Sequence, residues 1–263
     1  IAYISPLIDQ WMASFLGAGA VSILSYANRL IVGAASLAAS ALSPGLLPHF
    51  SRLSARGETV QLNKHYVAAV RMTWWIGIVL AGLTWLLSEP FVVLLYEHGQ
   101  FTRQDSLAVA NIGGWFCLQV PRMLAGVAGA AMLSASGQNR VFLPLSVLIA
   151  TVNAVGNLCL MPFYGLAGIA LSTVVTYAIS LVTINVALVR KGLIQPPWIL
   201  MKDGVISLGT GMTLAAFLLN ENAKLTAIPT TPQITLSALA LAVFGTIAFL
   251  CTKEVLSAIR RTA

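Results

Sequence analysis

Long apolar runs separated by short polar segments make up most of this chain. A membrane-spanning helix needs about 20 predominantly apolar residues. Runs of that length, or close to it, cover residues 1–16, 21–47, 67–87, 107–134, 141–161, 166–189, 205–219 and 234–251. Because 58 % of the residues are hydrophobic and only 9 % are charged, the chain cannot cover a soluble globule with polar side chains. The pattern predicts an all-α polytopic membrane bundle of about eight transmembrane helices.

Two of the longer connections between these runs carry specific expectations. Residues 48–66 are too polar to insert, so we expect a cytoplasmic linker with helical parts that lie along the membrane surface. Residues 88–105 contain a short apolar stretch bounded by Pro90 and Gly99, which is too short to cross a bilayer. In this second segment we expect a helix end and a turn packed at the outer surface.

The basic residues gather in alternate connections, and this asymmetry predicts the orientation. On one side of the membrane the connections carry only Arg103 and Lys224, and the other basic residues of the connections lie on the opposite side. Because short cytoplasmic connections are enriched in Lys and Arg, we expect a cytoplasmic C-terminus. The net charge of +7 then reflects membrane orientation, and we expect no nucleic-acid partner. The residues on the basic side are Arg52, Arg56, Lys64, Arg71, Arg140, Arg190, Lys191, Lys202, Lys253, Arg260 and Arg261.

The run at residues 21–47 carries one arginine, Arg29, among apolar positions. A guanidinium stays protonated inside a bilayer, so it must face protein, water or an anionic ligand. We therefore expect its helix face to line a polar cavity. The alternative is that small residues only let helices approach closely, with Arg29 paired to a carboxylate. Helical spacing places Ser22, Ser25, Arg29, Gly33, Ser36, Ser40 and Ser43 on this one face.

A second arginine, Arg122, lies within the run at residues 107–134. Pro121 beside it predicts a kink, and Gln119 lies about one helical turn away. Two interpretations of Arg122 are open. It either faces the polar cavity as a second buried charge, or its alkyl stem lets the guanidinium snorkel to the cytoplasmic surface.

Asp9 is the only carboxylate inside a predicted span. An isolated carboxylate is costly there, so it needs a cation, an arginine or a proton. Asn153 and Asn157 lie one turn apart on a later span, and Thr173 lies on the next. Carboxylate, amide and hydroxyl oxygens are ligands for a hard cation such as Na⁺. The alternatives are hydrogen bonds between helices without an ion, or a pair between Asp9 and Arg29.

The cysteines and histidines predict no further cofactor. Cys117, Cys159 and Cys251 fall in separate apolar runs and are expected to be packing residues. The histidines lie at the ends of spans or in connections without metal-ligand spacing, so we expect no zinc or iron site. No arrangement of residues predicts catalysis, and we expect that the protein is not an enzyme. Na⁺ is the one candidate cofactor.

Several segments together resemble the MurJ (MviN) family of lipid II flippases, within the multidrug/oligosaccharidyl-lipid/polysaccharide exporter superfamily. They cover about the first half of the chain, and the spacing of Tyr, Gly, Phe and Thr in the last of them is the most specific. The matching residues are Ile8-Asp9 with Ala13-Ser14 and Leu16 before Gly19, Tyr26-Ala27-Asn28-Arg29-Leu30, Leu47-Pro48 with Ser51-Arg52, and Leu95-Tyr96-Glu97-His98-Gly99-Gln100-Phe101-Thr102 with Asp105.

The resemblance implies the C-terminal lobe of a two-lobed exporter in a bacterial inner membrane. Residues 1–189 would form a six-helix lobe with a truncated first helix. Residues 190–263 would add two transmembrane helices and a cytoplasmic C-terminal segment. The two helices would line a groove for the polyprenyl chain of the lipid. The missing N-terminal lobe holds most of the family's cavity arginines, so this chain alone should not flip a lipid.

The implied function is the movement of lipid II between the leaflets by alternating access. Membrane lipid and cell-wall synthesis proteins are expected as further partners. Arg29 matches the family's cavity arginine and Arg122 a basic position, so both are expected to bind substrate, together with Asn28, Ser25 and Ser36. Asn28 departs from the aspartate that many members carry, which leaves Arg29 without a local counter-ion. The alternatives are an exporter of another polyprenyl-linked saccharide or a drug, and a membrane scaffold that transports nothing.

Overall fold

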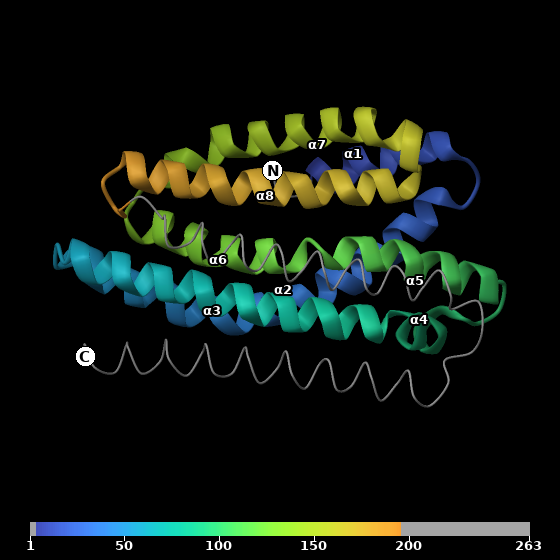
Figure 1. Cartoon of the computed structure of the whole chain (residues 1–263), viewed down its shortest axis with the longest axis horizontal. Helices are drawn as coiled ribbons and strands as arrows, with labels where there is room; N and C mark the ends of the chain where they lie inside the picture. The colour runs from blue at the N-terminus through green and yellow to red at the C-terminus, as the bar shows by residue number, and fades with distance from the viewer. Residues whose placement is uncertain (1–3, 196–263) are drawn as a thin grey trace. The chain divides into compact units, whose positions relative to one another are not determined.

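The computed structural model of the chain describes residues 4–195, and every regular element in that range is helical (Figure 1). The expected all-α membrane fold is confirmed. The elements are α1 (Ile4–Ala13), η1 (Ser14–Leu16), α2 (Ala20–Ala55), α3 (Thr59–Leu86), α4 (Ser88–Tyr96), α5 (Arg103–Cys117), α6 (Val120–Ala135), η2 (Asn139–Val141), α7 (Phe142–Tyr164) and α8 (Leu166–Arg190).

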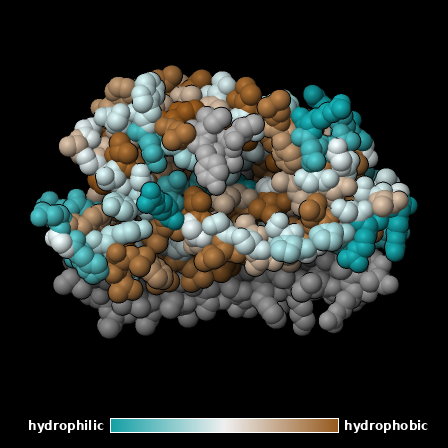
Figure 2. Space-filling view, turned by 180° about the vertical axis from the view of Figure 1, so that it is seen from behind, coloured by the Kyte–Doolittle hydropathy of each residue, from teal (hydrophilic) through white to brown (hydrophobic). Residues whose placement is uncertain are grey.

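Four helices of the described part are long and apolar enough to cross a membrane, or five spans if the bent pair α5 and α6 counts as one. Apolar side chains cover much of the middle of the face in Figure 2, and hydrophilic ones gather toward its two ends. The chain divides into two compact units, Ile1–Ile194 and Gln195–Ala263. The two predicted helices at residues 205–219 and 234–251 lie outside the described residues.

The helical parts expected at residues 48–66 are present, but they are continuous with the spans on either side, so the prediction of a separate linker is wrong. Helix α2 continues through Pro44 and Pro48 to Ala55, and α3 begins at Thr59, so only residues 56–58 join them. The segment is amphipathic: Phe50 and Tyr66 are both fully buried. Its average polarity hid this apolar face. Proline removes one backbone donor and is tolerated in membrane helices where other groups satisfy the freed carbonyls.

The predicted kink in the run at residues 107–134 is confirmed. Helices α5 and α6 meet at an angle of 45° across Leu118 and Gln119. Pro121 stands in the first turn of α6, where its missing N–H costs no helical hydrogen bond. Helix α3 packs directly against this break, because a Cβ added to Gly77 would lie closer than 3.0 Å to the Cα of Pro121.

Residues 88–105 form the short helix α4 and a turn, so a helix end and a turn are present as expected. The turn leads into α5 through a capping box. The Thr102 hydroxyl accepts a hydrogen bond from the Asp105 amide at 3.3 Å, and the Asp105 carboxylate accepts one from the Thr102 amide at 2.8 Å. Reciprocal bonds of this kind satisfy donors that a helix start leaves free.

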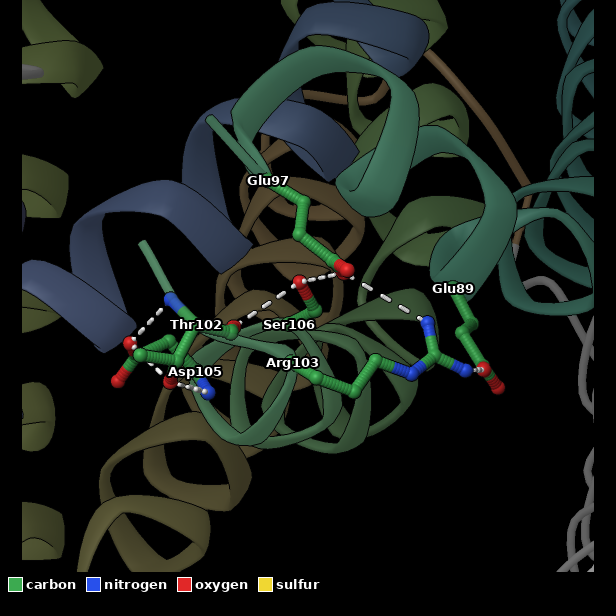
Figure 3. A network of polar contacts seen from close by, with 6 residues as sticks. All are labelled: Glu89, Glu97, Thr102, Arg103, Asp105 and Ser106. Carbon is green, nitrogen blue, oxygen red and sulfur yellow. Dashed lines mark hydrogen bonds and ion pairs between the residues drawn. The ribbon is translucent and has the colours of Figure 1, made fainter. Parts of the chain in front are cut away.

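A polar network ties α4 to α5 at the same turn (Figure 3). The Arg103 guanidinium extends between Glu89, with which it pairs, and Glu97, which lies 3.7 Å away. The Ser106 hydroxyl donates to Glu97 at 2.6 Å. The capping box and this network together fix the direction in which α5 enters the bundle.

An aromatic cluster joins this turn to α2. The ring of Tyr26 lies 4.7 Å from that of Tyr96 and 5.6 Å from that of Phe101, measured between centroids. Such separations suit tilted and edge-to-face aromatic contacts. Because Tyr26 lies one turn before Arg29, the cluster anchors the part of α2 that carries the arginine.

The buried stripe of α2 faces α5 and α6. Leu24, Ala27, Ile31 and Ala35 recur at helical spacing and are all buried in the main apolar core. The cysteines behave differently from one another. Cys117 is buried as predicted, whereas Cys159 is exposed on α7, so its assignment as a packing residue is wrong. An apolar run in a membrane helix has a lipid-facing side as well as a packed one, and composition does not separate the two.

Candidate functional site

The polar face of α2 is exposed along most of its length. Ser25 is the half-buried exception among its members. The Ser36 hydroxyl donates to the Gly33 carbonyl at 3.0 Å, within its own helix. Within residues 4–195 no helix covers this face, so close packing does not explain its small residues. The exposed members are Ser22, Arg29, Gly33, Ser36, Ser40 and Ser43.

Arg29 has no hydrogen-bond or ion-pair partner among the described residues. Its neighbour Asn28 is half-buried and equally without a side-chain partner there. Asp9 and Arg29 do not form a pair in the structure, because Asp9 is bound by Asn157 and Thr173. A guanidinium carries five donors and cannot lose its charge. Arg29 therefore presents a positive charge and an unused set of donors on an exposed polar face.

Arg122 lies at the break between α5 and α6. Its guanidinium donates to the carbonyl of Leu118, and its central carbon lies 6.0 Å from the centroid of the Trp74 ring. A break in a helix leaves carbonyls without their amide partners, and a cation over an aromatic face is attracted to it. These contacts hold the guanidinium back toward the break and away from the far end of α6. None of them is with the polar face of α2.

Asp9 is 6 % exposed and joins three helices. Asn157 on α7 donates from its side-chain amide to one carboxylate oxygen at 2.7 Å. The Thr173 hydroxyl on α8 lies 3.2 Å from the other carboxylate oxygen and 3.1 Å from the Ile169 carbonyl. The predicted hydrogen bonds between helices are thus present, and the structure brings together residues separated by 148 and 164 positions in the sequence.

Several atoms beside this carboxylate have no partner. Both side-chain polar atoms of Asn153 and the side-chain oxygen of Asn157 are buried without a hydrogen bond. The backbone carbonyl of Asn153 does accept a bond, from the Ser172 hydroxyl at 3.0 Å. A buried polar group without a partner costs about 1–3 kcal/mol. The orphaned amide oxygens, the Asp9 carboxylate and the Thr173 hydroxyl form a set of oxygens that suits a hard cation.

A pocket connects the Asp9 cluster to α2. A small hollow lies between α1, α2 and α5, and its enclosed part has room for about one water molecule. Asp9 of the cluster and Ser25 and Asn28 of α2 all contribute to its wall, so two groups of predicted residues meet here. Ser36 and Arg122 are not part of it. The lining residues are Pro6, Asp9, Gln10, Leu24, Ser25, Asn28 and Phe116.

Two glutamines of interest were not among the predicted site residues. Gln10 lines the pocket next to Asp9. Gln119 stands at the N-terminal cap of α6, is 1 % exposed, and has neither amide atom hydrogen-bonded. The available signal was the same for both: an uncharged amide within an apolar run, beside a residue already singled out. Charged residues drew the prediction because their cost in a membrane is larger.

Comparison with known proteins identifies the family. The family model described as lipid II flippase MurJ matches residues 1–248. A probable lipid II flippase MurJ of Rickettsia prowazekii is 29 % identical over 178 residues, which are 66 % of this chain and 34 % of that protein. The lipid II flippase MurJ of Burkholderia cenocepacia is 23 % identical over 218 residues, 83 % of this chain and 42 % of its own length.

A solved structure shares the fold. It is a lipid II flippase MurJ in an inward closed conformation, with a TM-score of 0.68 and 21 % identity, and the match covers 93 % of this chain and 50 % of that one. The chain therefore spans about half of the matched structure and less than half of these curated relatives. Since the family model covers nearly the whole sequence, this multi-pass membrane protein belongs to the lipid II flippase MurJ family.

Proposed function

We propose that this chain is the C-terminal lobe of a lipid II flippase and that Arg29 binds the diphosphate of the lipid. The observation that carries the proposal is an exposed, unpartnered arginine in the middle of an apolar helix, in a chain of the MurJ family. An arginine fork matches the oxygens of a diphosphate and forms strong charge-assisted hydrogen bonds with them. The exposed face of α2 then lines the central cavity, opposite an N-terminal lobe.

The mechanism is alternating access. The two lobes rock about the cavity so that the site opens to one leaflet and then to the other. Ser25, Asn28 and Ser36 offer hydrogen bonds to the head group, and Arg122 adds positive charge at the level of the α5–α6 break. The polyprenyl tail stays in lipid. No covalent bond is made or broken, so the protein acts as a transporter and not as an enzyme.

A sodium ion at Asp9 is part of the proposal. Asn153, Asn157 and Thr173 supply the remaining ligands, supported by their buried oxygens and by the contacts of Asn157 and Thr173 with Asp9. If the Asn157 side-chain amide rotated, its hydrogen bond to Asp9 would be lost, and its oxygen would be placed where it could bind the cation. Such an ion would balance the charge of the carboxylate and would join α1 to α7 and α8 through these residues.

The proposed location is the bacterial inner membrane with a cytoplasmic C-terminus. The asymmetry of Lys and Arg between the two sets of connections supports this orientation. The partners that follow are lipid II, the surrounding lipid and an N-terminal lobe. Proteins of cell-wall synthesis are further proposed partners.

The test is complementation in cells depleted of their own lipid II flippase. The chain is expressed as the complete two-lobed protein, either unchanged or with Arg29→Ala or Arg29→Lys. We expect the unchanged protein to support growth, R29A to fail and R29K to rescue in part, because a lysine keeps the charge but loses the fork. Arg140→Ala, in a short connection, is the matched control and should grow normally. Growth of R29A at a normal rate would refute the role of Arg29 in binding the diphosphate.

The cation is tested separately on purified protein. Na⁺ should raise the thermal midpoint of the parent protein more than K⁺ at equal ionic strength, since ligand binding to the folded state stabilises it. Asp9→Asn should remove the difference. If the parent shows no preference for Na⁺, the cation proposal is wrong while the lipid proposal stands.

A further inference from the structure

The pocket between α1, α2 and α5 is lined by polar side chains that have no partner. Gln10, Ser25 and Asn28 are half-buried, and none makes a side-chain hydrogen bond within residues 4–195. Ser25 and Asn28 lie five to eight residues into α2, so they stand roughly 8–12 Å along its axis. These side chains therefore offer oxygens that water or a cation in the pocket can contact.

The described lining of the pocket holds one acidic group and no basic one. Its only ionisable lining residue is Asp9, which means that the wall offers a carboxylate, amides and a hydroxyl but no cationic group. Arg29 follows Asn28 directly in sequence but lies on the exposed face and does not line the pocket. Carboxylate, amide and hydroxyl oxygens attract a hard cation, and the carboxylate repels an anion. The lining thus selects against the phosphate groups that Arg29 attracts.

The pocket is also small, and of the proposed cation ligands Asp9 lines it. Only about one water molecule fits at a time in its enclosed part. A cation that passes must give up part of its hydration shell, and oxygens along the wall have to replace the lost water. Gln10, Ser25 and Asn28 supply such oxygens, and Asp9 ends the series with Asn157 and Thr173 bound behind it.

We propose that this pocket is the path by which a monovalent cation reaches Asp9 from the polar face of α2, with Gln10, Ser25 and Asn28 as successive oxygen ligands. The inference rests on the proposed cation site at Asp9 and is independent of the lipid that Arg29 binds. Because Asn28 and Arg29 are neighbours, a cation in the path stands close to an anion on the arginine. Each ligand then strengthens the binding of the other, as reciprocity of coupling requires.

Silver ions test the path, because Ag⁺ is close to Na⁺ in size and reacts with thiols. Ser25→Cys is introduced into the full chain after Cys159 and Cys251 are replaced by alanine, and the buried Cys117 is kept. Membranes are exposed to Ag⁺ in chloride-free buffer with Na⁺ or choline. The thiol that remains is then counted with a fluorescent maleimide after denaturation. Ser36→Cys, on the exposed face of the same helix, is the matched control.

We expect Ag⁺ to modify Ser25→Cys, and Na⁺ to slow the reaction several-fold relative to choline. Asp9→Asn should abolish the protection, and Ser36→Cys should react equally in both salts. Equal rates at Ser25→Cys in both salts would mean a pocket that holds only water, and no reaction would mean a closed one. Either result overturns the path. If Na⁺ still stabilises the parent protein through Asp9, the cation site survives that failure, and complementation by the complete protein tests lipid transport independently.

Discussion

Gly156 lies on α7 between Asn153 and Asn157, at a point where α7 packs against α8. A Cβ added there would lie closer than 3.0 Å to the hydroxyl oxygen of Ser172 and 3.2 Å from its Cβ. Ser172 is 1 % exposed, and its hydroxyl is held by the Asn153 carbonyl at 3.0 Å. The side chain therefore has nowhere to move without losing this bond. We predict that Gly156→Ala destabilises the lobe and displaces the Asp9 cluster.

The magnitude follows from three contributions. Overpacking a filled interface costs about 1–3 kcal/mol. Displacing Ser172 from its acceptor costs about 1 kcal/mol more, and the higher helix propensity of alanine returns roughly 1 kcal/mol. The net loss is about 1–3 kcal/mol. For a chain of this size each kcal/mol corresponds to about 2–4 °C in the thermal midpoint, so G156A should melt several degrees below the parent.

The assay is thermal unfolding of purified protein followed by intrinsic tryptophan fluorescence. Ser172→Ala removes the oxygen that an added methyl group meets, so G156A combined with S172A should cost less than the sum of the two single changes. Gly126→Ala is the matched control, because Gly126 is also helical and a Cβ there meets nothing within 4 Å. A midpoint for G156A equal to that of G126A, or strict additivity with S172A, would refute the reasoning.

Three further predictions use contacts elsewhere in the bundle. Tyr66→Phe should lower stability by about 1 kcal/mol in the same melting assay, because the buried phenol donates to Asn185 at 3.0 Å. His49 and His65 join α2 to α3 through a ring-nitrogen hydrogen bond. Replacing either histidine by leucine should cost nearly as much as replacing both, as measured by a double-mutant cycle. Arg103→Ala should change the midpoint little, because its ion pairs are largely exposed.

The helices were largely predictable, and the exceptions have a common physical cause. A run of apolar residues long enough to cross a bilayer has few alternatives to a helix, since backbone groups there must bond internally. The same argument fails where charged and apolar residues alternate. Phe50 and Tyr66 stand near the two ends of the predicted linker at residues 48–66 and are buried with their ring centroids 6.3 Å apart, but the charges between them in sequence made the segment too polar on average. A helical periodicity test would have recovered the continuation of α2.

The site was predictable in part for a related reason. A buried carboxylate inside a span needs partners, and Asp9 finds them in Asn157 and Thr173 across most of the described sequence. Contacts that depend on the angle between two helices could not be predicted from the sequence. The pocket wall formed with Gln10 is an example. Another is the histidine pair, which requires α2 to extend beyond its predicted end.

The separation of Asp9 from Arg29 supports the proposal that this lobe binds two ligands. The two charges lie near the same part of α2, yet Asp9 is bound to Asn157 and Thr173 while Arg29 has no partner among the described residues. Had they paired, each would have satisfied the other and neither would attract an ion. A free arginine within a span costs at least about 2.5 kcal/mol. If Arg29 binds a diphosphate as proposed, the anion recovers part of this cost, and the unfavourable charge of the ligand-free lobe contributes to the free energy of binding.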